Sequence, residues 1–376
     1  MIWLTWRQFR AQAITAAAAL AAFAIVLAAA EPSLSGEYHS SGFASCHGAT
    51  CTGLASTFIN DLSSGAGIAG VPETPYMILY FLSVAVILIA PAIIGIFWGA
   101  PLIARELEAG TFRLTWNQSI TRTRWLAVKL ALIGVAAMAV TEAFSLIQAW
   151  WAAPIGKAVG LGGGGSIFGE TRFGVFVFPT HGITPLGYAA FGFALGVTAG
   201  LLVRRAIPAM AITLAIFAAA QLITPLIRPN LFPTSHTVAT IAATGANVSL
   251  TANPRLAFTA TTVPGHPGAW IISSEGVNAT GQPVSTMPAA CEPLIPQTNV
   301  THRGRGPTTS APGSTALNTG SNALNNCVAS HGIRVAESYQ PASHYWPLQL
   351  SETGMYLALA LALAGYCFWR LNRRRT

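Results

Sequence analysis

The sequence predicts an all-α polytopic membrane protein with six transmembrane helices, both termini in the cytoplasm, and a large loop-rich extracytoplasmic region between helices 5 and 6. Three observations lead to this fold class. Only 9% of the 376 residues are charged, against about 25% in soluble domains. Six apolar runs approach the ~20 residues that an α-helix needs to cross a bilayer. Lys and Arg gather in alternate segments between those runs.

The apolar runs divide the chain into regions. We expect an interfacial helix at residues 1–10, helices 1–5 within 11–227, the extracytoplasmic region at 228–350, and helix 6 with a basic tail at 351–376. Residues 31–75 are rich in Ser, Gly and Thr, so they are expected to fold little beyond a small disulfide. The expected spans are 11–30, 76–98, 126–152, 185–203, 207–227 and 354–371.

The basic residues set the expected orientation. With a cytoplasmic N-terminus and alternating spans, 13 of the 20 Lys and Arg fall in the short segments assigned to the cytoplasm, and 7 fall in much longer segments outside. Positive charge favours the cytoplasmic side of a membrane. The net charge of +8 therefore reflects topology and attraction to anionic headgroups, so membrane lipid is an expected partner and nucleic acid is not.

The first ten residues have the pattern of an interfacial helix. Trp3, Trp6 and Arg10 are helically spaced, and Arg7 lies among them. The apolar run that follows is longer than the core of a signal peptide, so we expect an uncleaved anchor.

A charged segment, residues 105–129, separates the second and third runs. Residues 105–108 are expected to continue the second helix out of the membrane for one turn. Gly110 interrupts that helix, and Thr111 is placed to cap a second, short one.

The short helix after Thr111 is expected to be amphipathic. Phe112 and Trp116 share one face at i and i+4, with Arg113 beside them, and Thr121 can cap the third run. Such a helix at the membrane surface could serve as the docking site through which a partner protein moves the membrane helices. An ordinary positively charged topogenic loop is the alternative, and spacing alone leaves both open.

Four of the five cysteines fall in segments assigned to the oxidising side. Pairing Cys46 with Cys51 and Cys291 with Cys327 requires the smallest loops. His47 lies beside Cys46, but no second His or Cys pair has ligand spacing, so no metal site is expected.

The third run contains Glu142, a carboxylate inside an apolar stretch. Intramembrane carboxylates are costly and usually face protein or water. A pathway or proton-relay group and a hydrogen-bonded packing residue are both open interpretations.

Small residues predict where helices pack closely. The second run contains Gly95 and Gly99 after Pro91, which indicates a kink and a close helix contact. The fourth run carries a smooth stripe at i, i+4 and i+8, formed by Gly192, Gly196 and Gly200.

Sequence motifs of catalysis are missing. The chain has no GxxxxGK[ST] phosphate loop, no HExxH and no GxSxG. We therefore expect no enzyme activity and no cofactor in this chain.

These features together resemble the permease subunits of ABC-2 type ABC transporters, in particular a bacterial group that opens with MxWLTWRQxR. The resemblance covers all six spans and is weakest in the extracytoplasmic region. It rests on MIWLTWRQFR at 1–10, on Arg105-Glu106-x-Glu108-x-Gly110-Thr111, on Trp116-x-Gln118-Ser119-x-Thr121-Arg122-x-Arg124-Trp125 with Lys129, on Arg204-Arg205-x-x-Pro208-Ala209-Met210, and on Tyr339-Gln-Pro-Ala-Ser, Trp346 and Gln349.

The resemblance implies a function. Two six-span permeases, identical or different, would form a dimer in the cell membrane and work as an exporter. Each would dock a cytoplasmic coupling helix, within residues 105–124, into a separate ATPase subunit. That subunit would bind ATP and Mg. Trp3, Trp6, Arg7 and Arg10 would lie in the connecting helix. The coupling element would contain Arg105, Glu106, Glu108, Gly110, Thr111, Phe112, Arg113 and Trp116.

Two other classes of function stay open from the sequence. A membrane-anchored sensor would use the extracytoplasmic region to bind a ligand or an envelope partner. A membrane enzyme is the third interpretation, and the missing catalytic motifs count against it.

Overall fold

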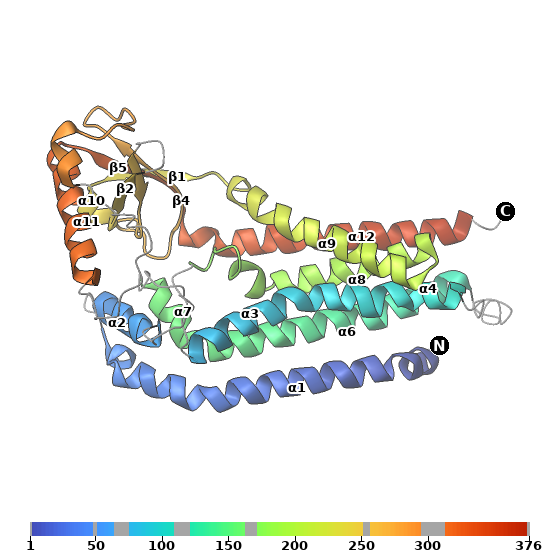
Figure 1. Cartoon of the computed structure of the whole chain (residues 1–376). Helices are drawn as coiled ribbons and strands as arrows, with labels where there is room; N and C mark the ends of the chain where they lie inside the picture. Colours follow the sequence, from blue (N-terminus) through green and yellow to red (C-terminus); the bar gives the residue numbers. More distant parts are fainter. Residues whose placement is uncertain are drawn as a thin grey trace, which may run out of the picture. The chain divides into compact units, whose positions relative to one another are not determined.

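The computed structural model describes residues 2–47, 51–63, 75–108, 121–161, 171–250, 256–294 and 313–373. These residues form two compact units (Figure 1). The helical unit comprises Met1–Leu231 and Ser343–Thr376, and the sheet unit comprises Phe232–Ala342.

The helical unit is built from long apolar helices. A π-helical turn, η3 (Gly95–Gly99), joins α3 to α4, and 3-10 turns lie at Phe43–Ser45 (η1), Phe178–Thr180 (η5), Arg228–Asn230 (η6) and Ala342–His344 (η8). The α-helices are α1 (Ile2–Ser40), α2 (Cys51–Ser63), α3 (Pro75–Ile94), α4 (Ala100–Glu108), α6 (Arg122–Trp151), α7 (Ala153–Gly160), α8 (Thr184–Val203), α9 (Ala206–Ile227) and α12 (Tyr345–Arg373).

Six helices of the described residues are long and apolar enough to cross a membrane. Each matches one of the runs expected from hydropathy; the third ends one residue before its run, at Trp151, and all six extend further at one or both ends. They are Phe9–Ser40, Pro75–Glu106, Thr123–Trp151, Thr184–Val203, Ala206–Asn230 and Ala342–Arg373.

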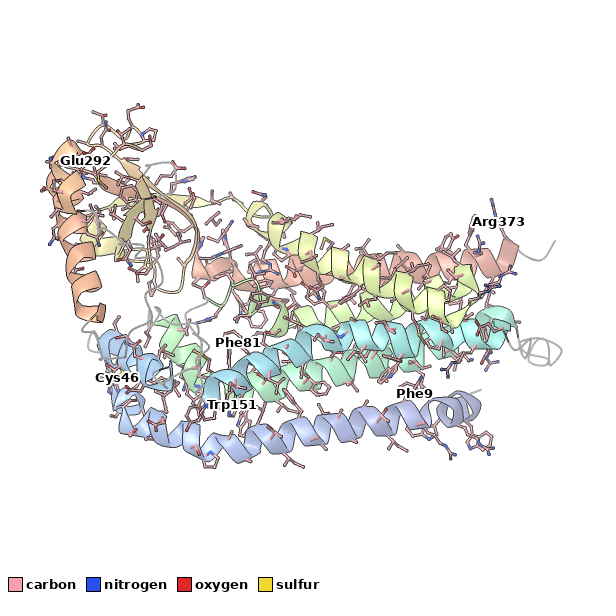
Figure 2. The ribbon with its side chains drawn as sticks, in the orientation of Figure 1. Phe9, Cys46, Phe81, Trp151, Glu292 and Arg373 are labelled. Atoms are coloured by element: carbon pink, nitrogen blue, oxygen red, sulfur yellow. A yellow bond between two sulfur atoms is a disulfide. The ribbon has the colours of Figure 1, made fainter. Side chains whose placement is uncertain are left out.

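Successive spans run in opposite directions, so the helical unit has two distinct ends (Figure 1). The basic end contains the starts of α1, α6 and α9 and the ends of α4, α8 and α12. The disulfide end contains α2, α7 and the Cys46–Cys51 disulfide. Phe9 and Arg373 lie at the basic end, and Cys46 and Trp151 lie at the disulfide end (Figure 2). That the basic end faces the cytoplasm stays a prediction.

Helix α8 is the centre of the helical unit. In its apolar window 83% of the residues are buried, against 6% in the window of α1. Its neighbours are α3 with η3 and α4, α6, α9 and α12. Small residues let these helices approach α8 closely. The Thr198 hydroxyl forms a hydrogen bond within α8, donating to the carbonyl of Ala194 at 2.7 Å. Polar side chains satisfied in this way are compatible with a membrane interior.

The glycine stripe on α8 packs against η3, as the spacing predicts. A Cβ added at Gly95 would lie 2.5 Å from the carbonyl oxygen of Gly192, and one added at Gly196 would meet the carbonyl oxygen of Gly95. Gly99 and Gly200 are as close to the backbone of the facing helix. Backbones in such contact leave no room for a side chain, so the two helices are fixed in register.

At the disulfide end the structure corrects one expectation. Residues 31–75 were expected to fold little, but α1 continues to Ser40 and α2 packs beside α7. The apolar residues of α2 lie at i, i+3, i+4 and i+7, the spacing of an amphipathic helix. They are the buried residues Ala55, Phe58, Ile59 and Leu62.

The sheet unit is also more ordered than its composition suggests. Antiparallel strands β1 (Ser235–Ala239), β5 (Arg334–Gln340) and β4 (Trp270–Val277) form one sheet in that order. A second sheet pairs β2 (Asn247–Leu250) with β3 (Leu256–Thr259). Helices α10 (Ile241–Thr244) and α11 (Gly313–Ser330) and the 3-10 turn η7 (Ala289–Leu294) complete the unit.

An apolar core holds the sheet unit together. It includes Val248, Phe258, Leu324 and Val335, which come from both sheets and from α11. The alternation of buried and exposed residues along β5 is that of a strand with one face in a core. This short pattern was overlooked because Ser, Thr, Gly and Pro dominate the region.

Candidate functional site

The structure describes part of the predicted coupling element. Arg105, Glu106 and Glu108 lie in the last turn of α4, at the basic end. The other predicted coupling residues lie outside the described residues; they are Gly110, Thr111, Phe112, Arg113 and Trp116. Thr121 caps α6 as its place before the third run predicts, because its hydroxyl accepts from the N–H of Arg124 at 3.4 Å.

Glu106 forms an ion pair with Lys129 on α6. Lys129 is buried, and its ammonium group lies 4.6 Å from the ring centre of Trp125. A buried ammonium needs a paired charge because desolvation disfavours it alone. The pair therefore ties the end of α4 to the start of α6, the two helix ends that flank the charged segment.

Glu108 links α4 to a third helix. The N–H of Ala206, the first residue of α9, donates to Glu108 Oε1 at 2.9 Å. The two-residue turn before it contains Arg204 in a left-handed conformation with φ 59°, which ends α8. A carboxylate at a helix N-terminus satisfies a free N–H and interacts favourably with the helix dipole. Glu106 and Glu108 therefore both have partners inside the chain.

The predicted interfacial residues belong to the same continuous helix as the first span. Trp3 and Trp6 are exposed, and the Arg7 guanidinium lies 5.5 Å from the ring centre of Trp3. Phe9 is buried instead, edge-on to Trp98 of η3 at 4.8 Å. Arg10 is exposed. A position in the membrane interface stays a prediction for these residues.

Glu142 lies in the middle of α6 and is half-buried. Among the described residues nothing bonds to its Oε2. Neither a relay nor a packing role is decided by this geometry.

Sequence reasoning missed a buried charge cluster at the disulfide end of the bundle. Arg228, which was assigned to the extracytoplasmic region, is 1% exposed and forms a two-point ion pair with Glu352 on α12. Its Nε donates to Oε2 at 2.9 Å and its Nη2 donates to Oε1 at 3.2 Å. The hydroxyl of Tyr188 on α8 donates to the same carboxylate. One cluster thus joins α8, α12 and η6, the turn that directly follows α9.

Aromatic rings and hydroxyl groups extend this cluster. The Arg228 guanidinium lies 4.1 Å from the ring centre of Phe178, and Tyr356 packs edge-on to Tyr188 at 4.6 Å. The Tyr356 hydroxyl is 2.5 Å from the Thr224 hydroxyl. A signal for this pair was present in the sequence. Arg228 and Glu352 carry opposite charges and lie at the ends of two spans that are predicted to reach the same membrane depth.

The sheet unit contains a second feature that the sequence did not reveal. Glu337 lies on β5, the central strand, and is 1% exposed. Among the described residues no hydrogen bond reaches either carboxylate oxygen. Burial raises the pKa of this carboxyl group to about 7, so its neutral form is favoured.

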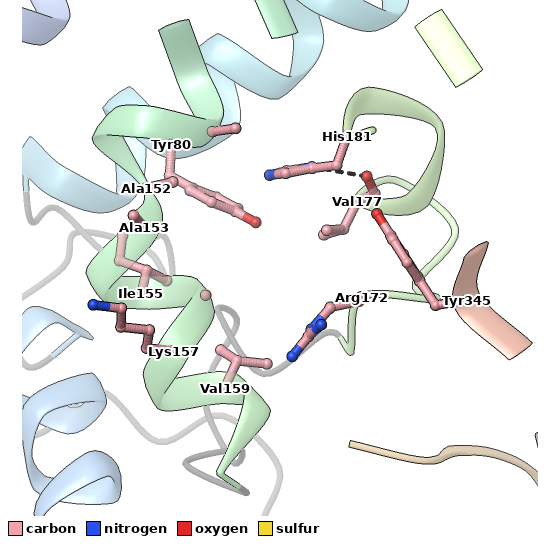
Figure 3. A pocket seen from close by; sticks show the side chains of 12 residues that line it. Tyr80, Ala152, Ala153, Ile155, Lys157, Val159, Arg172, Val177, His181 and Tyr345 are labelled. Carbon is pink, nitrogen blue, oxygen red and sulfur yellow. Dashed lines mark hydrogen bonds between the residues drawn. The ribbon is translucent and has the colours of Figure 1, made fainter. Parts of the chain in front are cut away.

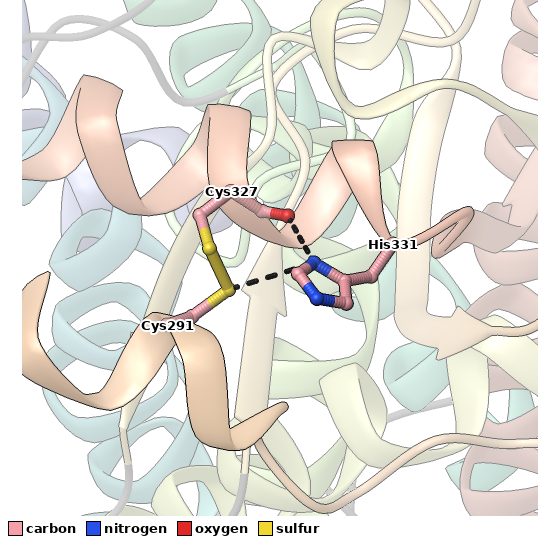
Figure 4. A group of neighbouring side chains, drawn as sticks. All are labelled: Cys291, Cys327 and His331. Atoms are coloured by element: carbon pink, nitrogen blue, oxygen red, sulfur yellow. Dashed lines mark hydrogen bonds between the residues drawn. A yellow bond between two sulfur atoms is a disulfide. The ribbon is translucent and has the colours of Figure 1, made fainter.

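The disulfides follow the smallest loops. Cys46 is joined to Cys51, and Cys291 to Cys327. His331 lies beside the second disulfide, and its Nδ1 donates to the carbonyl of Cys327 at 2.9 Å (Figure 4). The three side chains lie within 4.8 Å of one another, but two of them are a disulfide. Thiolates are the metal ligands of cysteine, so the oxidised group offers a single imidazole.

A family model described as ABC-2 membrane transporter related matches residues 17–228. No curated protein and no solved structure matches the chain. The matched residues cover more than half of the chain and reach from α1 to the end of α9, which includes five of the six candidate spans. The chain therefore belongs to the ABC-2 membrane transporter related family and is a multi-pass membrane permease.

Proposed function

We propose that this permease is the membrane subunit of an ATP-driven exporter and that residues 105–124 couple it to a separate ATPase subunit. Permeases of this family generally work with an ATPase partner, which would bind ATP and Mg. Membership of the family favours transport over the sensor alternative. A second permease subunit would complete the assembly, and export is the direction that the family resemblance suggests.

The attachment of α4 at the basic end is the observation that carries this proposal. Helix α4 ends at Glu108 and α6 begins at Arg122, so the described residues on either side of the charged segment's middle part belong to these two helices. Glu106 fastens the departing helix to α6 through Lys129, and Glu108 fastens it to α9 through the N–H of Ala206. A force applied to the segment would therefore act on three spans together.

Close packing supports transmission along the bundle. Helix α4 follows η3 without a break, and the glycines of η3 contact the α8 backbone directly. Backbone contacts without intervening side chains have little room to deform. Displacement of α4 would therefore move α8, the central helix, rather than be absorbed between the two.

The test separates binding of the ATPase from transmission. Phe112→Ala removes the aromatic group proposed to enter the ATPase cleft. Such an anchor is often worth about 2 kcal/mol, which corresponds to about a thirtyfold loss of affinity. Phe97→Ala is the matched control, because Phe97 is 54% exposed on a span and would face lipid. Glu106→Gln should keep ATPase binding but lower the stimulated rate of ATP hydrolysis.

Co-purification with the ATPase, quantified by titration in nanodiscs, gives the affinities. Hydrolysis rates of the reconstituted complex give the second readout. Unchanged affinity and rate in Phe112→Ala would reject residues 105–124 as the coupling element. Equal losses in Phe112→Ala and Phe97→Ala would show that the effect comes from membrane insertion.

A further inference from the structure

The helical unit contains a cavity of about 330 Å³ at its disulfide end (Figure 3). Its walls come from α3, the junction of α6 and α7, the segment before α8, and Tyr345 at the start of α12. Small-molecule sites in proteins typically measure ~300–1,000 Å³ and combine apolar walls with a few polar groups. Both the size and the lining of this cavity fit that description.

The lining has a polar group at each end and apolar walls between. Ile155 and Val159 on α7 face Val177 across the hollow (Figure 3). Arg172 lies at one end, with its guanidinium group extending toward α7, and His181 lies at the other. A ligand lying along the cavity would have the Arg172 cation at one of its ends and apolar side chains along its length.

The charge of the cavity is positive. None of the lining residues is acidic, and among the described residues no ion pair involves Arg172. Lys157 also belongs to the lining, but its ammonium group points away from the hollow (Figure 3) and lies 6.0 Å from the ring centre of Tyr38. Arginine presents a planar set of donors suited to carboxylate and phosphate oxygens.

His181 does not add charge at the far end. Its Nδ1 donates to the carbonyl of Val177 at 3.0 Å, so Nε2 carries the free electron pair of the neutral ring. Burial lowers the pKa of His181, which keeps the ring neutral at pH 7. The ring extends across the hollow toward Tyr80 (Figure 3). Arg172 therefore carries the positive charge that faces the hollow.

The wall of the cavity is held in place by α12. Gln349 Oε1 accepts from the N–H groups of Ile183 and Thr184 at 3.1 and 3.2 Å. Its Nε2 donates to the carbonyls of Phe178 and His181 at 3.2 and 3.1 Å. A single buried amide thus fixes the segment before α8, and a preformed site binds without an ordering cost.

We propose that this cavity binds an anionic amphiphile, whose carboxylate or phosphate headgroup pairs with Arg172 and whose apolar body lies between α7 and Val177. The ligand is either a lipid of the surrounding bilayer or a free amphiphile. Binding requires no ATPase, so it stands or falls independently of the proposed coupling.

Photo-crosslinking of the full chain in phosphatidylcholine nanodiscs tests the site. The probe is dodecanoic acid with a diazirine near its methyl end, and its methyl ester is the uncharged comparison. We expect the acid to label α7 or the segment before α8. The ester should label them at least about tenfold less, because it cannot form the ion pair with Arg172. Arg172→Gln should lower labelling by the acid similarly, and Arg172→Lys should recover part of it.

A second variant adds a large side chain to the cavity lining at a position that is open around the Cβ. Gly156 lines the cavity from α7, and a Cβ added there meets no atom within 4 Å. Gly156→Phe should therefore abolish labelling by the acid. Gly53→Phe in α2 is the matched control, since Gly53 is equally open and lies outside the cavity lining.

The outcomes distinguish the two sources of ligand. Competition by phosphatidylglycerol placed in the nanodisc would identify a lipid headgroup as the occupant. Competition by dodecyl phosphate but not by phosphatidylglycerol would identify a free amphiphile. Equal labelling by acid and ester, or labelling that persists in Gly156→Phe, would overturn the proposal.

Discussion

Removing the carboxylate of Glu352 should destabilise the helical unit more than any other single loss of charge described above. Arg228 is 1% exposed, and both of its bonds to Glu352 are near ideal length at 2.9 and 3.2 Å. In Glu352→Gln the guanidinium stays charged and buried without a counterion. Breaking a buried pair from one side costs ~3–5 kcal/mol. We expect a loss of unfolding free energy in that range.

A double substitution distinguishes a lost attraction from an exposed charge. Arg228→Met combined with Glu352→Leu removes both charges and keeps apolar volume, which is often neutral for a buried pair. Its unfolding free energy should return to within about 1 kcal/mol of the unmodified protein. Glu142→Gln is the control, because Glu142 is also an intramembrane carboxylate but has no ion pair among the described residues. That change should leave stability unaltered or raise it.

Unfolding in increasing fractions of a denaturing detergent, followed by circular dichroism, measures all four proteins. The expected order is a large loss for Glu352→Gln, recovery in the double variant, and no loss for Glu142→Gln. A loss below about 1 kcal/mol for Glu352→Gln would refute the reasoning, since it would mean that water or lipid headgroups solvate the arginine. A double variant as unstable as the single one would show that Glu352 acts through packing.

Three further outcomes follow from the geometry. Gly196→Ala forces α8 away from η3 and should lower the unfolding free energy by ~1–3 kcal/mol in the same assay. Gly365→Ala on α12 should raise it slightly, because a Cβ added at Gly365 meets no other atom within 4 Å. The raised pKa of Glu337 contributes up to about 3 kcal/mol to the stability of the sheet unit below pH 4.5, and this contribution is lost as pH rises from 4.5 through 7. Glu337→Gln should abolish this loss when unfolding is followed against pH. Breaking the Cys291–Cys327 disulfide, which joins residues 36 apart, should lower the unfolding free energy of that unit by about 4 kcal/mol, measured with and without reductant.

Hydropathy and spacing predicted the parts of the fold that depend on local sequence. A span needs only length and apolar character, so all six runs were found. Close packing at Gly95 and at Gly196 was also predicted, because smooth stripes have few other uses in a membrane helix, but the structure was needed to show that these two glycines meet. The strands of the sheet unit were not, since segments such as Asn247–Leu250 are too short to show alternation among turn-forming residues.

Pairings between distant residues could not be predicted from spacing. Glu106 and Lys129 are 23 residues apart, and Arg228 and Glu352 are 124 apart. The sequence shows that each charge needs a partner, but the choice of partner depends on how the helices pack. The family resemblance placed Glu106 and Glu108 in an element that docks into an ATPase subunit. The structure instead gives both carboxylates partners within the chain, so neither needs a basic group of another protein.

The first turns of α12 connect the two features found at the disulfide end. Gln349 and Glu352 are three residues apart and therefore share a helix face. Gln349 holds the cavity wall, and Glu352 holds Arg228 of η6 and Tyr188 of α8. Phe178 contacts both sides, with Tyr345 at 5.6 Å and the Arg228 guanidinium at 4.1 Å. A ligand that shifts the cavity wall would therefore change the contacts of α8, the same helix that η3 engages from the basic end through glycine. If the cavity binds a ligand and the ATPase moves α4 as proposed, both events would act on α8.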